Sequence, residues 1–249
     1  MKKNFRHQYL LSDFSETLKT HSFKGTSVNK VLAHVQEVAE NGGDMKHFPY
    51  VHATLFPFTN LIKMEWEARW ARGDDPELMT KMKHEIPWVN ERKKKLINKY
   101  ITPENRKYIG VMYLNLKVVL PFCKPIFMFN GTIFQLGPGV VYLFLISPYY
   151  EVLFFEHMDT HNKFDHDVYH ELYVNGWYLP YFVTAGMLRG EALQVANDTE
   201  IWNNKTYTNK PNYSLSSDAD STIFEWRKWF TQFYEGCAKK EAEREKYTW

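Results

Sequence analysis

The sequence predicts a single α+β domain in which an antiparallel sheet is flanked by helices. Between residues 108 and 156, β-branched and aromatic runs alternate with turns that contain Gly or Pro, which is typical of an antiparallel meander. Helical patterns precede this region at 75–100 and follow it at 168–202 and 221–247. At 249 residues, the chain is long enough for one sizeable core.

The N-terminal part predicts a strand that leads into a helix. Residues 1–21 are polar and weakly patterned, so we interpret them as a lead-in and expect the single domain to span residues 22–249. Residues 28–38 are β-branched and apolar and predict a strand, which passes into a helix over 37–47.

A second helical region begins at an acidic N-cap. Asp75 and Pro76 open a helix that continues to Lys83 and resumes over 88–100. Because turn residues separate the apolar runs that follow, we expect strands at 108–120, 126–135 and 140–146.

Helical periodicity returns near Val168 and runs to about Trp202, with interruptions at Gly176 and Pro180. We expect the final helix to span 221–247. Its apolar stripe consists of Ile223, Trp226, Phe230 and Phe233.

Composition excludes several classes of protein. Lys and Arg number 31 against 29 Asp and Glu, and the charges are interspersed, so we expect no nucleic-acid partner. Aromatic residues make up 17% of the chain, which suits an apolar cavity. The only cysteines are Cys123 and Cys237, which predicts reducing surroundings and no disulfide framework. Residues 125–150 are uncharged but interrupted by turn residues, so they predict hairpins and no transmembrane helix.

One motif spaces an acid and two histidines as Asp44-x2-His47-x4-His52. On a helix, the Asp44 carboxylate can accept the Nδ1 proton of His47 and leave Nε2 free for a metal. Because Pro49 disfavours helix at Phe48, we expect the helix to end near His47 and His52 to arrive from the next segment. Two imidazoles that converge from different directions suit an iron site with one open face.

Neighbouring residues strengthen this interpretation. Asn41 lies one helical turn before Asp44 on the same face, where it can support the ligands by hydrogen bonding. Gly42 and Gly43 permit a close approach of the backbone to another element.

A third ligand should be a carboxylate from a distant part of the sequence, and Asp198 is our choice. Gln194 precedes it by four residues and Trp202 follows by four, so one helical face would present all three inward. Glu191 and Glu200 are the rival carboxylates.

A second group of histidines has spacings that could chelate zinc. We favour a solvated loop for this polar stretch, which lies between an expected strand and an expected helix. The group is nevertheless the runner-up metal site and consists of His157, His161, His166 and His170 with Asp159, Asp165 and Asp167.

The run VNKVLAHVQEVAENGGDMKH at 28–47 resembles the catalytic-domain signature of Rieske-type non-haem iron sterol oxygenases, especially the Neverland-type cholesterol 7-desaturases. Three later segments resemble the same family: 135–141, 198–207 and 229–234. The resemblance covers about residues 22–236.

The resemblance implies a role for each motif residue. His47, His52 and Asp198 would be the ligands of a mononuclear Fe(2+) ion. Asp44 would hydrogen-bond a ligand histidine and carry electrons from a Rieske centre in a neighbouring subunit.

The resemblance also implies a fold and an activity. The fold would be a helix-grip (START-like) catalytic domain, with a curved antiparallel sheet and helices around a deep apolar cavity, assembled as a homotrimer. The substrate would be a sterol, and the expected reaction is cholesterol 7-desaturation with dioxygen and electrons from a reduced nicotinamide cofactor. Alternatives are a steroid hydroxylase of the 3-ketosteroid 9-alpha-hydroxylase type and a non-enzymatic sterol-binding module.

Family members carry an N-terminal Rieske domain with a Cys-x-His and a Cys-x2-His pair, usually preceded by a membrane segment. This sequence contains neither pair. We therefore expect the [2Fe-2S] cluster on a missing domain or on a ferredoxin or reductase partner. The resemblance implies membrane association of the family, whereas this sequence predicts no transmembrane segment of its own, which leaves the location of this chain unknown to cytoplasmic-facing.

Overall fold

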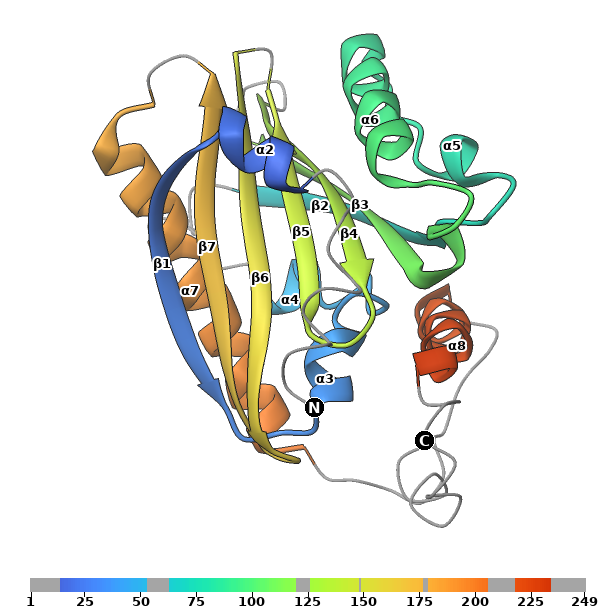
Figure 1. Ribbon diagram of the computed structural model, residues 1–249, viewed down its shortest axis with the longest axis vertical. Helices are drawn as coiled ribbons and strands as arrows, with labels where there is room; N and C mark the ends of the chain where they lie inside the picture. Colours follow the sequence, from blue (N-terminus) through green and yellow to red (C-terminus); the bar gives the residue numbers. More distant parts are fainter. Residues whose placement is uncertain are drawn as a thin grey trace.

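The computed structural model describes residues 14–52, 63–119, 126–147, 149–176, 179–205 and 218–233. A curved seven-stranded sheet with the order β1-β7-β6-β5-β4-β3-β2 forms its centre (Figure 1). Helices cover both faces of this sheet, which confirms the predicted α+β class.

Every neighbouring pair of strands is antiparallel. The predicted meander is confirmed, because the strands from β3 to β6 pair in chain order. The strands are β1 Ser22–Val31, β2 Lys63–Arg72, β3 Ile109–Val119, β4 Ile126–Leu136, β5 Val140–Ile146, β6 Tyr150–Asn162 and β7 Asp165–Gly176.

The α-helices of the described residues are α2 Phe14–Thr20, α3 Val35–Glu40, α4 Phe48–Val51, α5 Leu78–Lys81, α6 Pro87–Tyr100, α7 Tyr181–Asn203 and α8 Asp218–Phe230. Short 3-10 turns follow at Arg106–Tyr108 and Thr231–Phe233. In Figure 1, α7 runs behind β1, β7 and β6, whereas α2 crosses in front of the sheet.

Alternation along the strands divides the core between the two faces. On one face, Tyr142 and Phe144 of β5 belong to a cluster with Leu96 and Tyr100 of α6. On the other face, Leu172 and Val174 of β7 pack against Met187 and Leu188 of α7, and smaller apolar clusters extend toward α3 and α4. This second face holds the candidate site described below.

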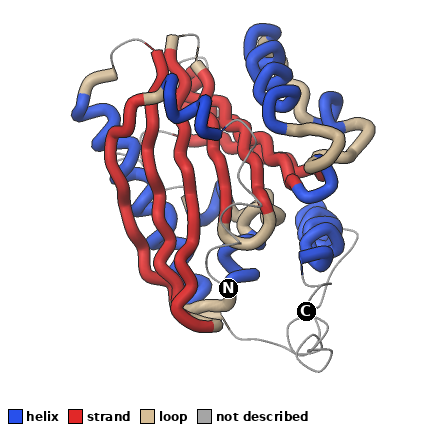
Figure 2. The backbone as a smooth tube through the Cα atoms, viewed as in Figure 1, coloured by secondary structure: helices blue, strands red, loops and turns tan. Residues whose placement is uncertain are grey.

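The expected helix near Val168 is wrong. Residues 165–176 form strand β7, which pairs with β6 as a hairpin (Figure 2). Alternate side chains from His166 to Val174 are buried, so the repeat has the period of two that a strand requires. Gly176, with φ +123°, ends β7, and the long helix begins only at Tyr181.

The N-terminal strand and helix both begin and end earlier in the chain than predicted. Strand β1 ends at Val31 and helix α3 ends at Glu40, so turns cover most of the segment that we expected to be helical. Strand β2 was not predicted. Part of the expected lead-in forms helix α2, whose Leu18 packs against the core, and the domain boundary at residue 22 stays a prediction.

The later helices follow the prediction more closely. Helix α6 matches the expected segment, whereas α5 is a single turn. The stripe of α8 is confirmed at Trp226 and Phe230, which are buried. The rest of the expected C-terminal helix, 234–247, lies outside the described residues. Among the helices that are described, none combines the length and apolar character needed to cross a membrane.

Candidate metal centre

His47 and His52 flank the one-turn helix α4, as its N-cap and C-cap residues. The predicted separation of the two histidines by a break at Phe48 is therefore wrong. Pro49 lies in the first turn, where its missing N–H costs no helical hydrogen bond. The two imidazole centroids lie 5.2 Å apart with the rings steeply inclined, so the rings approach the same point from different directions.

The orientation of His47 is set by the main chain. Its Nδ1 donates to the carbonyl oxygen of Asp44, because a carbonyl can only accept. This contact leaves Nε2 unprotonated and available to a metal. We expected the Asp44 carboxylate in this place, but it instead accepts a hydrogen bond from the backbone N–H of Lys46 at 3.2 Å. The difference arises because residues 41–47 form turns and no helix.

Asp198 reaches the same point from the buried side of α7. Its Oδ2 accepts a 2.8 Å hydrogen bond from Nδ2 of Asn41 and lies 3.6 Å from Nε2 of His52. Asn41 therefore contacts the carboxylate of this group directly, and its supporting role in metal binding stays a prediction.

Burial controls the protonation of these groups. It raises the pKa of Asp198 to about 8, and the nearby charge of Glu191 adds to this effect. It lowers the pKa of His52 to about 3, with a smaller contribution from His47, and it also lowers the pKa of His47. Neutral imidazoles are the form that binds metal ions.

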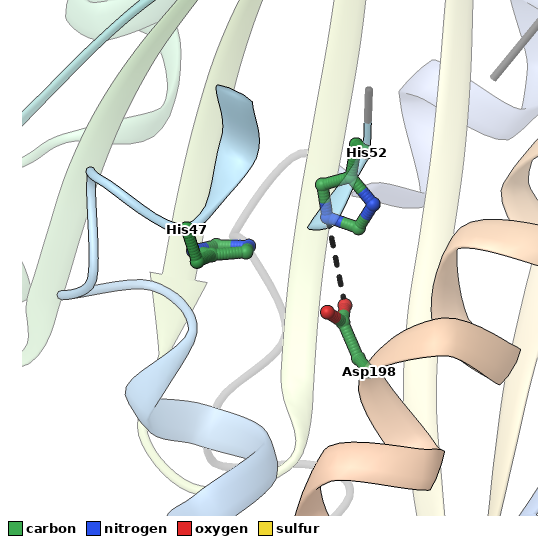
Figure 3. A group of neighbouring side chains, drawn as sticks. All are labelled: His47, His52 and Asp198. Carbon is green, nitrogen blue, oxygen red and sulfur yellow. Dashed lines mark ion pairs between the residues drawn. The ribbon is translucent and has the colours of Figure 1, made fainter. Parts of the chain in front are cut away.

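His47, His52 and Asp198 come together as the sequence predicts. One donor atom from each lies within 4.8 Å of the other two, and Figure 3 shows the histidines from the α4 segment facing Asp198 across the gap. Nδ1 of His52 is buried without a hydrogen-bond partner, so no protein contact fixes this ring in one tautomer. A 2-His-1-carboxylate group of this kind fits non-haem Fe(2+).

These residues line a cavity with about 900 Å³ of space between protein atoms, its open mouth included. From α7, Gln194, Asp198 and Trp202 face the cavity, as their four-residue spacing predicts. The sheet contributes mainly apolar side chains, among them Met112, Leu114, Ile133, Val141 and Leu143.

The rival carboxylates and the second histidine group behave differently from Asp198. Glu200 is exposed, whereas Glu191 lines the cavity without joining the His47 group. The four later histidines do not converge. His157 stacks on Tyr169, exposed His161 pairs with Asp167, His166 contacts Thr160, and His170 points to the opposite face of β7 from Tyr169.

Sequence reasoning missed Glu156, which lines the cavity beside the metal group. The alternation of apolar residues along β6 could have indicated this position. Val152 and Phe154 are buried on the same face of β6 as Glu156, and continuing that alternation places the carboxylate inward.

The fold and the site together define an α+β domain that presents two histidines and one carboxylate inside an apolar cavity. The chain belongs to the family described as the 3-ketosteroid 9alpha-hydroxylase C-terminal domain, whose model matches residues 6–120 and 180–234.

Curated relatives carry the name cholesterol 7-desaturase. A Ciona intestinalis protein, nvd 2, is 24% identical over 88% of this chain and 44% of its own length. A Bombyx mori protein is 28% identical over 87% of this chain and 42% of its own length. A Caenorhabditis elegans protein is 27% identical over 84% of this chain and 45% of its own length. These matches confirm the family resemblance, and the chain spans less than half the length of these relatives.

A solved structure shares the fold. Dicamba monooxygenase bound to 3,6-dichlorosalicylic acid aligns with a TM-score of 0.52 at 9% identity, covering 87% of this chain and 61% of that one.

Proposed function

We propose that this chain is the catalytic portion of a Rieske-type non-haem iron oxygenase that acts on a sterol. The observation that carries the proposal is the convergence of His47, His52 and Asp198 inside an apolar cavity. In this proposal the three side chains hold one Fe(2+) ion and leave an open face toward the cavity. The ion would supply the activation of dioxygen, with electrons delivered from outside this chain.

The chain's own residues prepare this site before any metal binds. The Asp44 carbonyl holds the proton on Nδ1 of His47, and Asn41 fixes one carboxylate oxygen of Asp198. Such supporting contacts reduce the reorganisation that binding requires. The apolar walls keep bulk water from the reacting carbon, which protects a reactive oxidant from side reactions.

Cholesterol is the preferred substrate, and 7-desaturation, the removal of one hydrogen from C7 and one from an adjacent carbon, is the preferred reaction. The names of the curated relatives support this choice. The cavity is also consistent with it, since a sterol is bound mainly by apolar surface with few polar anchors. Hydroxylation of a 3-ketosteroid is the second candidate, and the description of the matching family model favours it.

Electrons would enter beside Asp44. This half-buried residue lies in the turn before His47, on the segment that carries two of the three ligands. In the proposal, the [2Fe-2S] cluster belongs to a separate domain or a ferredoxin partner, reduced through a nicotinamide-dependent reductase. A homotrimer would bring such a cluster from a neighbouring subunit to Asp44.

Iron binding tests the first part of the proposal. In an anaerobic titration with Fe(2+), the 249-residue chain should bind one equivalent at the group of His47, His52 and Asp198. His47→Ala, His52→Ala and Asp198→Ala should each abolish this binding, whereas the exposed His161→Ala should not. If the unmodified chain binds cholesterol but no iron, a non-enzymatic sterol-binding module replaces the oxygenase.

Product analysis tests the second part. The iron-loaded chain would be supplied with a Rieske ferredoxin, its reductase, reduced nicotinamide cofactor and cholesterol, and the sterol analysed by mass spectrometry. Loss of two hydrogens supports desaturation, and gain of one oxygen supports hydroxylation. An unchanged sterol with a ketosteroid converted in its place would overturn the preferred substrate.

A further inference from the structure

A second group of potential metal donors lies in the same cavity region as the His47 group. Glu156 of β6 and His170 of β7 are directly paired across the strands, so their side chains share the face that α7 covers. Glu191 of α7 completes the group. One donor atom from each of the three lies within 4.8 Å of the other two.

The ring nitrogens of His170 are available to bind a metal ion. Its side chain is 0% exposed, and neither ring nitrogen makes a hydrogen bond, although Nε2 lies 3.4 Å from Oε2 of Glu156. Buried polar atoms are normally satisfied, because a buried group without a partner costs free energy. A cation between His170 and the carboxylates would accept the free lone pair of the ring.

The charge of the group points the same way. Two carboxylates and a neutral imidazole together match the charge of a divalent ion. Within the part of the chain that the structure describes, no Lys or Arg forms an ion pair with Glu156 or Glu191. Burial raises the pKa of Glu191, and the carboxylate of Glu156 raises the pKa of His170 against the effect of burial, so metal binding would release protons from this group.

We propose that Glu156, His170 and Glu191 form a second divalent-metal site, separate from the group of His47, His52 and Asp198. The oxygen, nitrogen and oxygen donors suit Zn²⁺, Mn²⁺ or Fe²⁺ and contain no thiolate. The two groups share no residue. Glu191 precedes Asp198 by seven residues on α7, which separates their backbones by about 10 Å along the helix axis.

Such an ion would join three elements. Glu156 and His170 belong to the sheet, and Glu191 belongs to the helix that also carries Asp198. The ion would therefore cross-link α7 to β6 and β7. It would thereby also fix the distance between Asp198 and the sheet. In this role the second metal is structural and takes no part in turnover.

The number of zinc ions bound per chain tests the proposal. The 249-residue chain is dialysed against buffered Zn²⁺ alone and analysed for bound metal by mass spectrometry. The unmodified chain should retain two equivalents, and Glu191→Gln and Asp198→Asn should each retain one. The double variant should retain none. Glu200→Gln removes an exposed carboxylate of the same helix and should still retain two.

Thermal unfolding gives a second measurement. Zn²⁺ should raise the melting temperature of Asp198→Asn, because only the second site remains, and should leave the double variant unchanged. Glu156→Gln serves in the same way if Glu191→Gln fails to fold. One equivalent in both the unmodified chain and Glu191→Gln, or two in every variant, would overturn the second site. The loss of one equivalent from Asp198→Asn reports on the His47 group alone. Failure of the proposed iron site and failure of the second site can therefore be distinguished.

Discussion

Nδ2 of Asn41 donates a 2.8 Å hydrogen bond to Oδ2 of Asp198, across 157 residues of sequence. The bond joins the turn after α3 to the buried face of α7. Because α4, with His47 and His52 at its ends, follows that turn, one contact holds two distant segments in a common geometry. The position of the carboxylate is therefore set before any metal binds.

Asn41→Ala should weaken Fe(2+) binding by about 10–100-fold, because Asp198 loses the group that orients it. Anaerobic titration calorimetry with Fe(2+) measures this effect. Asn204→Ala is the matched control, since its amide donates to the carbonyl of Glu200 near the end of the same helix. Equal affinities for Asn41→Ala and the control would show that the hydrogen bond does not organise the site.

Asp44→Asn should leave Fe(2+) affinity close to that of the unmodified chain. The contact that orients His47 comes from the main-chain carbonyl of Asp44, which the substitution retains. Turnover with a Rieske donor should fall, because the proposed electron bridge loses its charge. Binding and turnover measured on the same preparation separate the two roles. A loss of affinity as large as that of Asn41→Ala would assign the orienting role to the carboxylate.

The sequence predicts the metal group better than the elements that carry it. Residue types and spacing pointed to His47 and His52 and to Asp198 among three carboxylates, because chemistry restricts which side chains can serve as ligands. Their backbone setting depends on packing. The one-turn helix between the histidines is shorter than any periodic pattern can reveal.

The β6–β7 hairpin shows a different limit. Polar side chains of β7 that point away from α7 interrupt the apolar pattern, and histidines spaced by four residues imitate a helical face. Residues four positions apart share a face in a strand and also in a helix. The spacing of the histidines alone could therefore not distinguish the two. The same ambiguity concealed the approach of Glu156 to His170, which only strand pairing produces.

Gly43→Ala should destabilise the fold by about 1–3 kcal/mol, as overpacking of a tight contact does. A Cβ at this position would lie 2.5 Å from Cγ of the buried Trp226, so α8 or the turn must shift. This is the close approach that the glycine pair predicts. Urea unfolding measures the change in the free energy of unfolding.

Gly190→Ala is the control for this substitution. A Cβ on Gly190 meets no atom within 4 Å, so alanine should stabilise α7 by about 0.4–1 kcal/mol through the unfolded state. A Gly43→Ala protein as stable as the unmodified chain would mean that the turn and α8 can separate without cost.

Lys93 should make stability depend on pH. This side chain is 1% exposed, donates to the carbonyl of Met82 and lies 3.9 Å from the ring centroid of Tyr113. Burial lowers its pKa from 10.5 to about 7, with a smaller effect from Arg69. Between these values the unfolded chain binds the proton and the folded chain does not. The free energy of unfolding therefore rises with pH, by about 2 kcal/mol from pH 7 to pH 9.

Lys93→Met should remove this contribution, because methionine fills the same space without a titrating group. The measured quantity is the difference between the variant and the unmodified chain in urea unfolding at pH 7 and pH 9, which cancels the titration of all other groups. Methionine should be the more stable at pH 7, where the folded chain still holds part of the buried charge, and the advantage should shrink by pH 9. Lys94→Met, at an exposed neighbouring position, should show no such change. A constant difference at both values would mean that Lys93 keeps its proton in the folded protein throughout this range.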